Sequence, residues 1–384
     1  MSRQIDEVYV DDPRSLADVV SAASASPRYA IDTEFHRERT YFPRLALVQI
    51  QFATVNALID PLAVDPRLLA PLMESESLAI VHAAQQDLEV LRYAVGAVPK
   101  RMFDCQLAAG FLGYSTPSLS TLAQSLLKIE LSKGDRMTDW LRRPLTASQC
   151  EYARADVMHL ERMYDIIGGE LANRGRLEWV IDACEEMRSR PYGDADPQDA
   201  WLKIREARSL KGRARGVAQA LAEWREKRAM TTNVPVRRIL GDMALVSIAQ
   251  AAPRSTEDLS HVRGVDERSL GGSVAREILA VVRDGIERNV QLPASDGDGV
   301  DKRLKPLVTL ITAWIGELAR QHDLDPALLA TTRDVVGYVG GGASRLSTGW
   351  RRDLVGEDLD KLTSGRAGLG FASHGGLVLI HTDK

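Results

Sequence analysis

Two carboxylates lie two residues apart in the segment AIDTEF, residues 30–35. If this segment is a strand, its side chains alternate between faces, so Asp32 and Glu34 point to the same side. Two neighbouring carboxylates on an otherwise apolar strand repel each other unless a cation lies between them. A hard divalent cation such as Mg²⁺ or Mn²⁺ meets that need. The other interpretation is an exposed edge strand with solvated charges, and this segment alone does not decide between the two.

A further acid follows a short apolar run that ends at Val81, in the segment HAAQQDLEVL, residues 82–91. The pattern after residue 84 predicts a helix, with Asp87 in its first part. Leu88 and Leu91 would then pack inward, and either Asp87 or Glu89 could face the edge of the sheet. On its own this segment says little, because an acid on a helix is usually solvated.

The third segment pairs a phenol with a carboxylate. Tyr152 and Asp156 are four residues apart, so they share one face of a helix. Placed together, such groups can orient a water molecule beside a metal ion. A half-buried tyrosine next to a solvated acid is the plainer interpretation of this segment taken alone.

Taken together, the segments indicate a reaction. Four acids and one tyrosine occur in the order Asp-x-Glu, Asp, Tyr-x-x-x-Asp. This set suits two-metal phosphodiester hydrolysis, in which two cations about 4 Å apart stabilise the attacking and the leaving oxygens. Four carboxylates supply enough negative charge for two divalent ions, which act mainly by electrostatic stabilisation.

The elements that would position these groups follow from the hydrophobic pattern. Strand-like runs precede the helices and then alternate with them, which is typical of a mixed sheet covered by helices. The expected strands are Tyr29–Glu34, Leu45–Phe52, Ala57–Ile59 and Leu78–Val81. The expected helices are Val64–Ser77, Gln85–Val95 and Ser118–Leu127.

Two segments have the composition of linkers, Arg190–Pro197 and Pro293–Asp301. Both are rich in turn-forming residues and lack an apolar period. They predict three domains, over residues 1–190, 201–290 and 302–384. The second and third domains have mostly helical patterns. No coiled-coil heptads or long apolar stripe occur, so we expect a monomer.

The composition of the 384-residue chain, 45% hydrophobic and 27% charged, is that of a globular protein. No stretch approaches the roughly 20 apolar residues of a membrane span. The N-terminus lacks the order of a signal peptide, so we expect a cytoplasmic location. The cysteines, Cys105, Cys150 and Cys184, form no CxxC pair, which argues against a zinc site and fits a reducing compartment.

The net charge of −4 argues against nucleic-acid binding unless basic residues gather locally. They do so between Trp201 and Arg238, where only Glu206, Glu223 and Glu226 oppose them. The basic residues of this stretch are Lys203, Arg205, Arg208, Lys211, Arg213, Arg215, Arg225, Lys227, Arg228, Arg237 and Arg238. Such a run either neutralises phosphates or forms a solvated helix face, and its place behind the acidic segments favours phosphate binding.

The acidic segments sit in longer motifs that resemble the ribonuclease D family of DEDD exonucleases, in the subgroup with a tyrosine in the third motif. The motifs read DTEFHRERTYFPRLALVQI (residues 32–50), HAAQQDLEVL (82–91) and QCEYARADVMHL (149–160). LIDPL (58–62), FDCQLAA (103–109) and TDWLRRPL (138–145) also resemble the family. The resemblance spans nearly all of the first 185 residues, with its motifs in the family's order.

The resemblance implies a ribonuclease H-like α/β domain and a role for each acid. Asp32, Glu34 and Asp156 would bind the metal that holds the nucleophilic water. Asp32 would bridge to a second metal, with Asp87 contributing directly or through water. Tyr152 would hydrogen-bond the attacking water. The substrate would be the single-stranded 3′ end of an RNA such as a tRNA precursor, with nucleoside 5′-monophosphates as products.

The later domains resemble HRDC modules, which are small all-α nucleic-acid-binding domains. The likeness rests on residues 221–249 and 259–270, and on residues 304–362 for a second HRDC-like domain. In the family these domains could form a ring or funnel over the RNA. The apolar, glycine-rich segment Gly368–Ile380 has no role that we can derive.

Two other functions stay open. A DNA 3′→5′ exonuclease of the same superfamily would use the same acids, and the 2′-OH contacts that select RNA are not visible in the sequence. A non-catalytic RNA-binding protein is disfavoured by the complete set of acids. The expected domain order favours RNA hydrolysis.

A few residues near the motifs carry separate expectations. His82 is expected to be structural, Asp104 to cap the next helix, and Trp140 to lie in the core. Lys133, Arg136 and Arg143 are either substrate contacts or solvated charges. The run Tyr41–Pro43 either stacks on bases or forms a turn packed on the domain.

Overall fold

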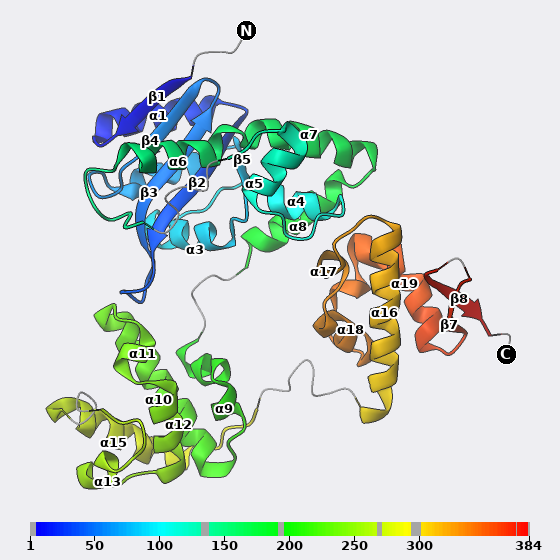
Figure 1. Cartoon of the computed structure of the whole chain (residues 1–384). Coiled ribbons are helices and arrows are strands. Elements are labelled where there is room, and N and C mark those ends of the chain that lie inside the picture. Colours follow the sequence, from blue (N-terminus) through cyan, green and yellow to red (C-terminus); the bar gives the residue numbers. More distant parts are fainter. Residues whose placement is uncertain are drawn as a thin grey trace.

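A six-stranded mixed sheet forms the centre of the N-terminal domain (Figure 1). The structure, a computed structural model, describes residues 5–131, 138–190, 196–266, 271–292, 301–373 and 375–382. The strand order is β1-β4-β3-β2-β5-β6. Strands β2, β3 and β4 pair antiparallel, whereas β1, β5 and β6 each join a neighbour in parallel. The strands are β1 Asp6–Val10, β2 Arg28–His36, β3 Arg44–Phe52, β4 Val55–Ile59, β5 Leu78–Val81 and β6 Met102–Asp104.

The four expected strands are confirmed as β2 to β5, and the mixed sheet with flanking helices is confirmed as well. Every residue of β3 after Arg44 is buried, which explains its near-continuous apolar sequence. Strand β6 has only three residues, too few for the alternation that would have revealed it.

Helices cover the sheet on both sides. In chain order they are α1 Pro13–Ala25, η1 Pro66–Leu69, α2 Ala70–Met73, α3 Gln85–Ala94, α4 Cys105–Gly110, α5 Leu119–Leu122, η2 Ala123–Leu127, α6 Ala147–Met158, α7 Leu160–Asn173 and α8 Leu177–Arg188. The continuous helix expected over residues 64–77 is wrong in extent, since only η1 and the single turn of α2 form. Pro66 and Pro71 each lack the N–H that a continuous helix would need there.

The middle domain is all-helical and has its own hydrophobic core, built around α10, α12 and α15. Its helices are η3 Pro197–Lys203, α9 Arg205–Arg208, α10 Gly212–Thr232, α11 Val236–Ile239, α12 Asp242–Ala251, α13 Thr256–Ser260 and α15 Gly272–Glu287. The two longest helices, α10 and α15, approach closely where Gly216 meets Gly285. This approach requires glycine at both positions, because a Cβ on either one would collide with the backbone of the other helix.

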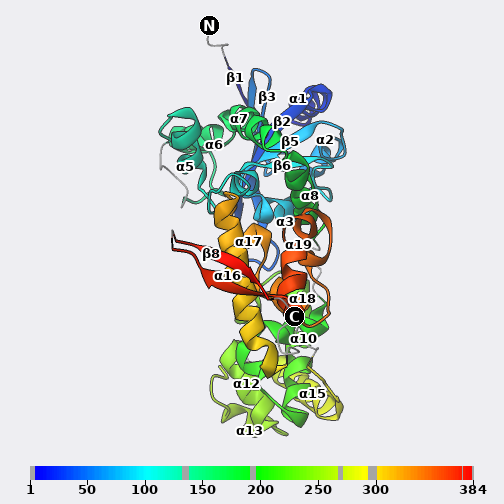
Figure 2. The same ribbon diagram turned by 90° about the vertical axis from the view of Figure 1, so that its right-hand side faces the viewer.

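The C-terminal domain is helical but ends in a β-hairpin, which was not predicted (Figure 2). Its elements are η4 Lys302–Leu304, α16 Lys305–Gln321, α17 Pro326–Leu329, α18 Thr332–Val339, η5 Arg345–Ser347, α19 Gly349–Thr363, β7 Ala367–Phe371 and β8 Leu377–His381. Gly368 and Gly370 lower the local strand propensity, so the sequence pattern does not predict β7.

The C-terminal domain packs directly on the exonuclease domain, although the middle domain separates them in sequence. One hydrophobic core includes residues of both. The rings of Trp179 on α8 and Trp350 on α19 stack at 4.8 Å between centroids, and Phe111 meets Trp350 edge to face at 5.4 Å. The backbone N–H of Asp325 donates to the carbonyl of Gly110 at 2.8 Å.

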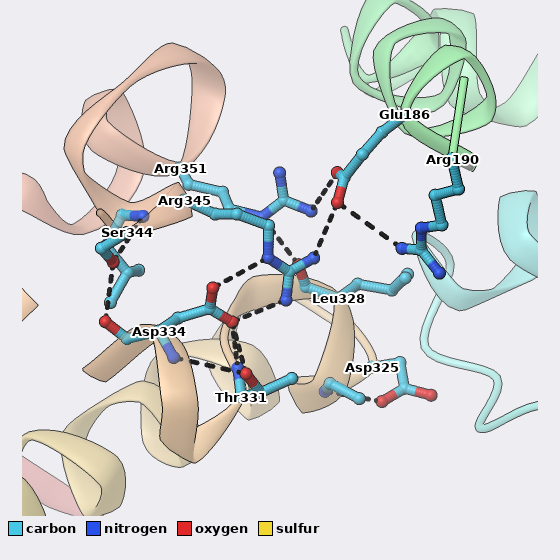
Figure 3. A network of polar contacts seen from close by, with 11 residues as sticks. Glu186, Arg190, Asp325, Leu328, Thr331, Asp334, Ser344, Arg345 and Arg351 are labelled. Carbon is cyan, nitrogen blue, oxygen red and sulfur yellow. Dashed lines mark hydrogen bonds and ion pairs between the residues drawn. The ribbon is translucent and has the colours of Figure 1, made fainter. Parts of the chain in front are cut away.

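A polar network borders this interface (Figure 3). Glu186 on α8 lies 3.7 Å from the guanidinium of Arg345 and 3.8 Å from that of Arg351. Arg345 also donates to both carboxylate oxygens of Asp334, at 3.0 and 2.7 Å. Apolar stacking and the ion network therefore both join the first and last domains.

The middle domain contacts the exonuclease domain through the loop that follows β2. Tyr41 donates to the carboxylate of Glu226 at 2.7 Å, and the N–H of Phe42 donates to Asn233 Oδ1 at 3.1 Å. The run Tyr41–Pro43 is therefore packed, and it joins two domains. Among the described residues, no helix is both long and apolar enough to span a bilayer.

Candidate active site

Strand β2 and helix α6 bring three carboxylates together. One oxygen each from Asp32, Glu34 and Asp156 lies within 4.8 Å of the others. Asp32 and Glu34 reach this point because they alternate along β2 with Ile31 and Thr33, which are buried on the other face. The predicted common face of the two acids is confirmed, and the third acid comes from a helix about 120 residues later in the chain.

Helix α6 is fixed at both its start and its buried face. It begins with a capping box, in which Thr146 and Gln149 exchange side-chain and backbone hydrogen bonds. Ala153 packs on the sheet against Leu47 and Leu58. This position places Tyr152 and Asp156 over the end of β2, and a hydrogen bond joins the phenol to the carboxylate as their spacing predicts.

The fourth acid, Asp87, comes from the first turn of α3. It accepts a hydrogen bond from the hydroxyl of Thr33 and lies close enough to Asp32 to affect its ionisation. It is not a member of the three-carboxylate group. Glu89, the alternative on the same helix, instead forms an ion pair with Arg37. Asp87 thus lies beside Thr33 and near Asp32, whereas Glu89 is paired away from the three carboxylates.

Asp104 positions the segment that carries Asp87. Its fully buried carboxylate caps α4 by accepting from the N–H groups of Gln106 and Leu107, as expected. The same carboxylate also accepts from the N–H groups of Ala83 and Ala84, at 3.1 and 2.9 Å. This second pair fixes the turn that begins α3, and no pattern in the sequence predicts it.

The electrostatics of the cluster favour a bound cation. Burial, followed by the charges of Asp87, Asp156 and Glu34, raises the pKa of Asp32 well above its usual range. Burial raises the pKa of Asp87 to about 6. Burial and the neighbouring carboxylates also raise the pKa of Tyr152, so it remains a protonated phenol at neutral pH. Crowded, partly desolvated carboxylate oxygens are the ligands that hard divalent ions prefer.

Several nearby residues have structural roles. Arg143 binds both carboxylate oxygens of Asp60, at 2.6 and 2.7 Å, and the carbonyl of Ala46, so it is no solvated charge. Trp140 is 4% exposed and packs in the core, as expected. His82 lies half-buried just after β5, and burial lowers its pKa. Lys133 and Arg136 lie outside the described residues.

The three cysteines are free, and none forms a disulfide. Cys105 and Cys184 are buried, and Cys150 is half-buried. Burial raises the pKa of the Cys105 and Cys184 thiols, so they behave as small apolar side chains.

Ten of the eleven basic residues in the stretch between Trp201 and Arg238 fall into two groups, and the eleventh, Arg215, donates to the carbonyls of Leu210 and Val290. Five cations are paired with acids of their own domain, namely Lys203, Arg225, Lys227, Arg228 and Arg237. Among the described residues, five exposed cations form no ion pair, namely Arg205, Arg208, Lys211, Arg213 and Arg238. Four of the unpaired cations flank the junction of α9 and α10, and we call these four, Arg205, Arg208, Lys211 and Arg213, the basic corner.

Comparisons with known proteins agree with this architecture. A family model described as a 3′-5′ exonuclease matches residues 8–172, and one described as an HRDC domain matches residues 214–282. Ribonuclease D of Granulibacter bethesdensis is 34% identical over 370 residues, which cover 92% of each chain. Ribonuclease D of Gluconacetobacter diazotrophicus is 34% identical over 95% of each chain.

Solved structures give the same result. The crystal structure of Escherichia coli RNase D, described as an exoribonuclease involved in structured RNA processing, superposes with a TM-score of 0.83 at 29% identity. The match covers 94% of this chain and 99% of that one. The fold and the matched domains define a 3′→5′ exonuclease with an HRDC domain. The chain belongs to the ribonuclease D family and is an exoribonuclease, a phosphodiester hydrolase.

Proposed function

We propose that the chain shortens the 3′ ends of structured RNAs, with tRNA precursors as the substrate class, by two-metal hydrolysis. The observation that carries this proposal is the cluster of Asp32, Glu34 and Asp156, with Asp87 and Tyr152 beside it. The described involvement of the E. coli relative in structured RNA processing supports the choice of substrate.

The chemistry assigns one task to each side chain. Asp32, Glu34 and Asp156 would hold one divalent cation, Mg²⁺ or Mn²⁺, and Asp32 with Asp87 a second. When bound, such ions supply Lewis-acid stabilisation of the attacking and leaving oxygens. The Tyr152 hydroxyl hydrogen-bonds the attacking water and aligns it with the phosphorus. The water oxygen forms the new bond to phosphorus, the 3′ oxygen of the preceding nucleotide leaves, and a nucleoside 5′-monophosphate is released.

The remaining parts of the chain hold the RNA. We assign residues 1–190 to the exonuclease domain, 201–290 to the HRDC domain and 302–384 to an HRDC-like domain. The basic corner would bind phosphates upstream of the 3′ end, because its cations lack protein partners among the described residues. The proposal includes a monomer acting in the cytoplasm.

The test is digestion of 5′-labelled RNA and of matched DNA, with and without Mg²⁺ or Mn²⁺, beside an Asp32→Asn control. We expect a metal-dependent ladder that shortens from the 3′ end of the RNA and is absent in the control. Faster cleavage of DNA would contradict the RNA assignment. Cleavage by Asp32→Asn at the wild-type rate would contradict the assigned metal site.

A further inference from the structure

A fully buried glutamine next to the acidic cluster has no hydrogen-bond partner. Gln49 on β3 is 0% exposed, and neither its Oε1 nor its Nε2 atom is hydrogen-bonded in the described part of the chain. Buried side-chain amides are normally paired, so an amide with both ends unpaired calls for an explanation.

The sheet register places this amide beside Asp32. Gln49 lies directly opposite Asp32 in the antiparallel pair β2–β3, so both side chains project from the same face. Directly opposed residues have Cβ atoms about 4.5–5.5 Å apart, which is within the reach of a glutamine amide. The unpaired group is therefore adjacent to a carboxylate of the proposed metal site.

The other neighbours of Gln49 leave few partners for it. Leu58 lies opposite it on β4, Leu47 precedes it on the same face, and Ala153 of α6 packs on these two leucines. None of the three has a polar side-chain atom. On β2 the facing side chains are Asp32 directly and Glu34 on the diagonal. Two other buried polar atoms without a partner lie nearby, Trp140 Nε1 in the same cluster, which is a donor, and Gln51 Oε1 on the same strand face. The carboxylates are the charged acceptors that face Gln49 from β2.

A cation bound at the cluster would give the Gln49 amide a hydrogen-bonding role. A carboxylate that ligates a metal keeps further lone pairs, and a hydrogen-bond donor in the layer behind it fixes the orientation of the group. The hydrogen bond that Asp32 accepts in this structure comes from the backbone N–H of Thr33. A neutral donor suits this position, since it orients the carboxylate without competing for the cation.

We propose that Gln49 is a positioning residue, whose Nε2–H group donates to the Asp32 carboxylate when a divalent cation is bound. The inference rests on the proposed function, because Asp32 must be a metal ligand. It adds a residue from β3 to a site otherwise built from β2, α3 and α6. It also gives a role to a fully buried polar side chain next to Leu47 on this strand face.

The test compares Gln49→Met with Gln51→Met in the full chain. Methionine is unbranched, similar in length to glutamine and unable to donate a hydrogen bond from its side chain. Gln51 is a matched control, since it lies on the same strand and face, is 5% exposed, and is paired with Ala30 and Asn56 instead of an acid. The measurements are the melting temperature without metal, calorimetric binding of Mn²⁺ alone, and kcat and KM on RNA.

For Gln49→Met we expect a melting temperature without metal equal to or above the wild-type value, because an unpaired buried amide is removed. The Mn²⁺ dissociation constant should rise about 10- to 100-fold, the usual effect of losing an outer hydrogen-bond partner of a metal ligand. At low Mn²⁺ kcat should fall and recover as Mn²⁺ is raised, with KM for RNA unchanged. Gln51→Met should bind Mn²⁺ as the wild type does.

Unchanged Mn²⁺ affinity in Gln49→Met would overturn the inference, and so would an equal loss in Gln51→Met. A lower melting temperature with wild-type Mn²⁺ affinity would likewise reduce Gln49 to a packing role. Failure of the proposed function has a different signature. In that case the wild type would bind Mn²⁺ no better than Asp32→Asn does, whatever residue occupies position 49.

Discussion

At the scale of single residues, the phenol of Tyr152 is the group whose role is most readily isolated. Tyr152→Phe removes only the hydroxyl, while the ring keeps its packing beside Trp140. We expect kcat to fall about 10²-fold, the usual contribution of a positioned hydroxyl in proton transfer and alignment. RNA affinity and the melting temperature should not change. Single-turnover kinetics measure the rate, and Tyr164→Phe on α7 is the control. A wild-type rate in Tyr152→Phe would exclude the water-positioning role.

In the metal-free protein, the free energy of unfolding should depend on pH through the ionisation of Asp87. Its pKa is raised to about 6 in the folded chain, so the folded state holds a proton that the unfolded state loses at about pH 4. The free energy of unfolding therefore falls as pH rises through this window, and the loss persists above it. Asp87→Asn removes the ionisation and should stabilise the metal-free protein at pH 7 by about 1–2 kcal/mol.

Urea unfolding between pH 4 and pH 7 measures this effect, with Asp18→Asn on the exposed face of α1 as the charge control. The difference between Asp87→Asn and wild type should vanish near pH 4. Added Mn²⁺ should reverse the order at pH 7, because only the wild type has the full set of carboxylates. A stabilisation that is equal at all pH values would contradict the electrostatic cause.

At the scale of elements, the sequence predicted those parts of the site that depend on local periodicity. The common face of Asp32 and Glu34 follows from strand alternation, and the pairing of Tyr152 with Asp156 follows from helical spacing. The choice of Asp87 over Glu89 depends on how α3 packs, which periodicity does not specify. Two of the four hydrogen bonds of Asp104 are local, and the other two reach back about 20 residues to Ala83 and Ala84, so a capping pattern reveals only the local pair.

Asp104 therefore supports two elements at once, and its loss should cost more than an ordinary helix cap. Asp104→Ala leaves four backbone N–H groups without their acceptor, so we expect a loss of about 3 kcal/mol in the free energy of unfolding. Asp12→Ala, which removes the exposed cap of α1, should cost about 1 kcal/mol. Urea unfolding compares the two variants, and equal losses would mean that the contacts to Ala83 and Ala84 contribute little.

At the scale of the whole molecule, the first and last domains share a core that the linker composition could not indicate. Two linker segments predict three separate domains, but contacts such as that between Trp179 and Trp350 join segments about 170 residues apart. The helical content and the order of the domains were predictable, whereas this interface depends on shapes that form only on folding.

Because the first and last domains share a core, a destabilising substitution in α19 should also destabilise the exonuclease domain. Trp350→Ala should destabilise the folded unit by about 3–5 kcal/mol, as large-to-small changes of a buried tryptophan do. Hydrogen exchange should then accelerate in α4 and α8 of the exonuclease domain. Trp201→Ala, in the separate core of the middle domain, should accelerate exchange in α10 and α12 instead. Exchange confined to the C-terminal domain in Trp350→Ala would contradict a common core.

The same architecture decides how RNA binding by the middle domain has to be tested. Deleting everything from Trp201 onward would also remove the C-terminal part of the shared core, so substitutions are the cleaner change. Replacing the four residues of the basic corner by glutamine removes cations that have no protein partners among the described residues. Each phosphate contact on single-stranded RNA contributes about 0.7 to the salt slope, so we expect the slope to fall by about 3 if all four contact phosphates.

A control of equal charge is available in the same domain. It replaces four cations that are already paired with acids, Lys203, Lys227, Arg228 and Arg237. This variant changes the net charge by the same amount, so long-range attraction is matched. It also removes four ion pairs, so its melting temperature is measured beside its RNA binding. Binding of labelled single-stranded RNA across a salt series should separate the two variants, with kcat at saturating RNA unchanged in both. Equal slopes would mean that the RNA follows another path across the molecule, because net charge alone would then account for the binding.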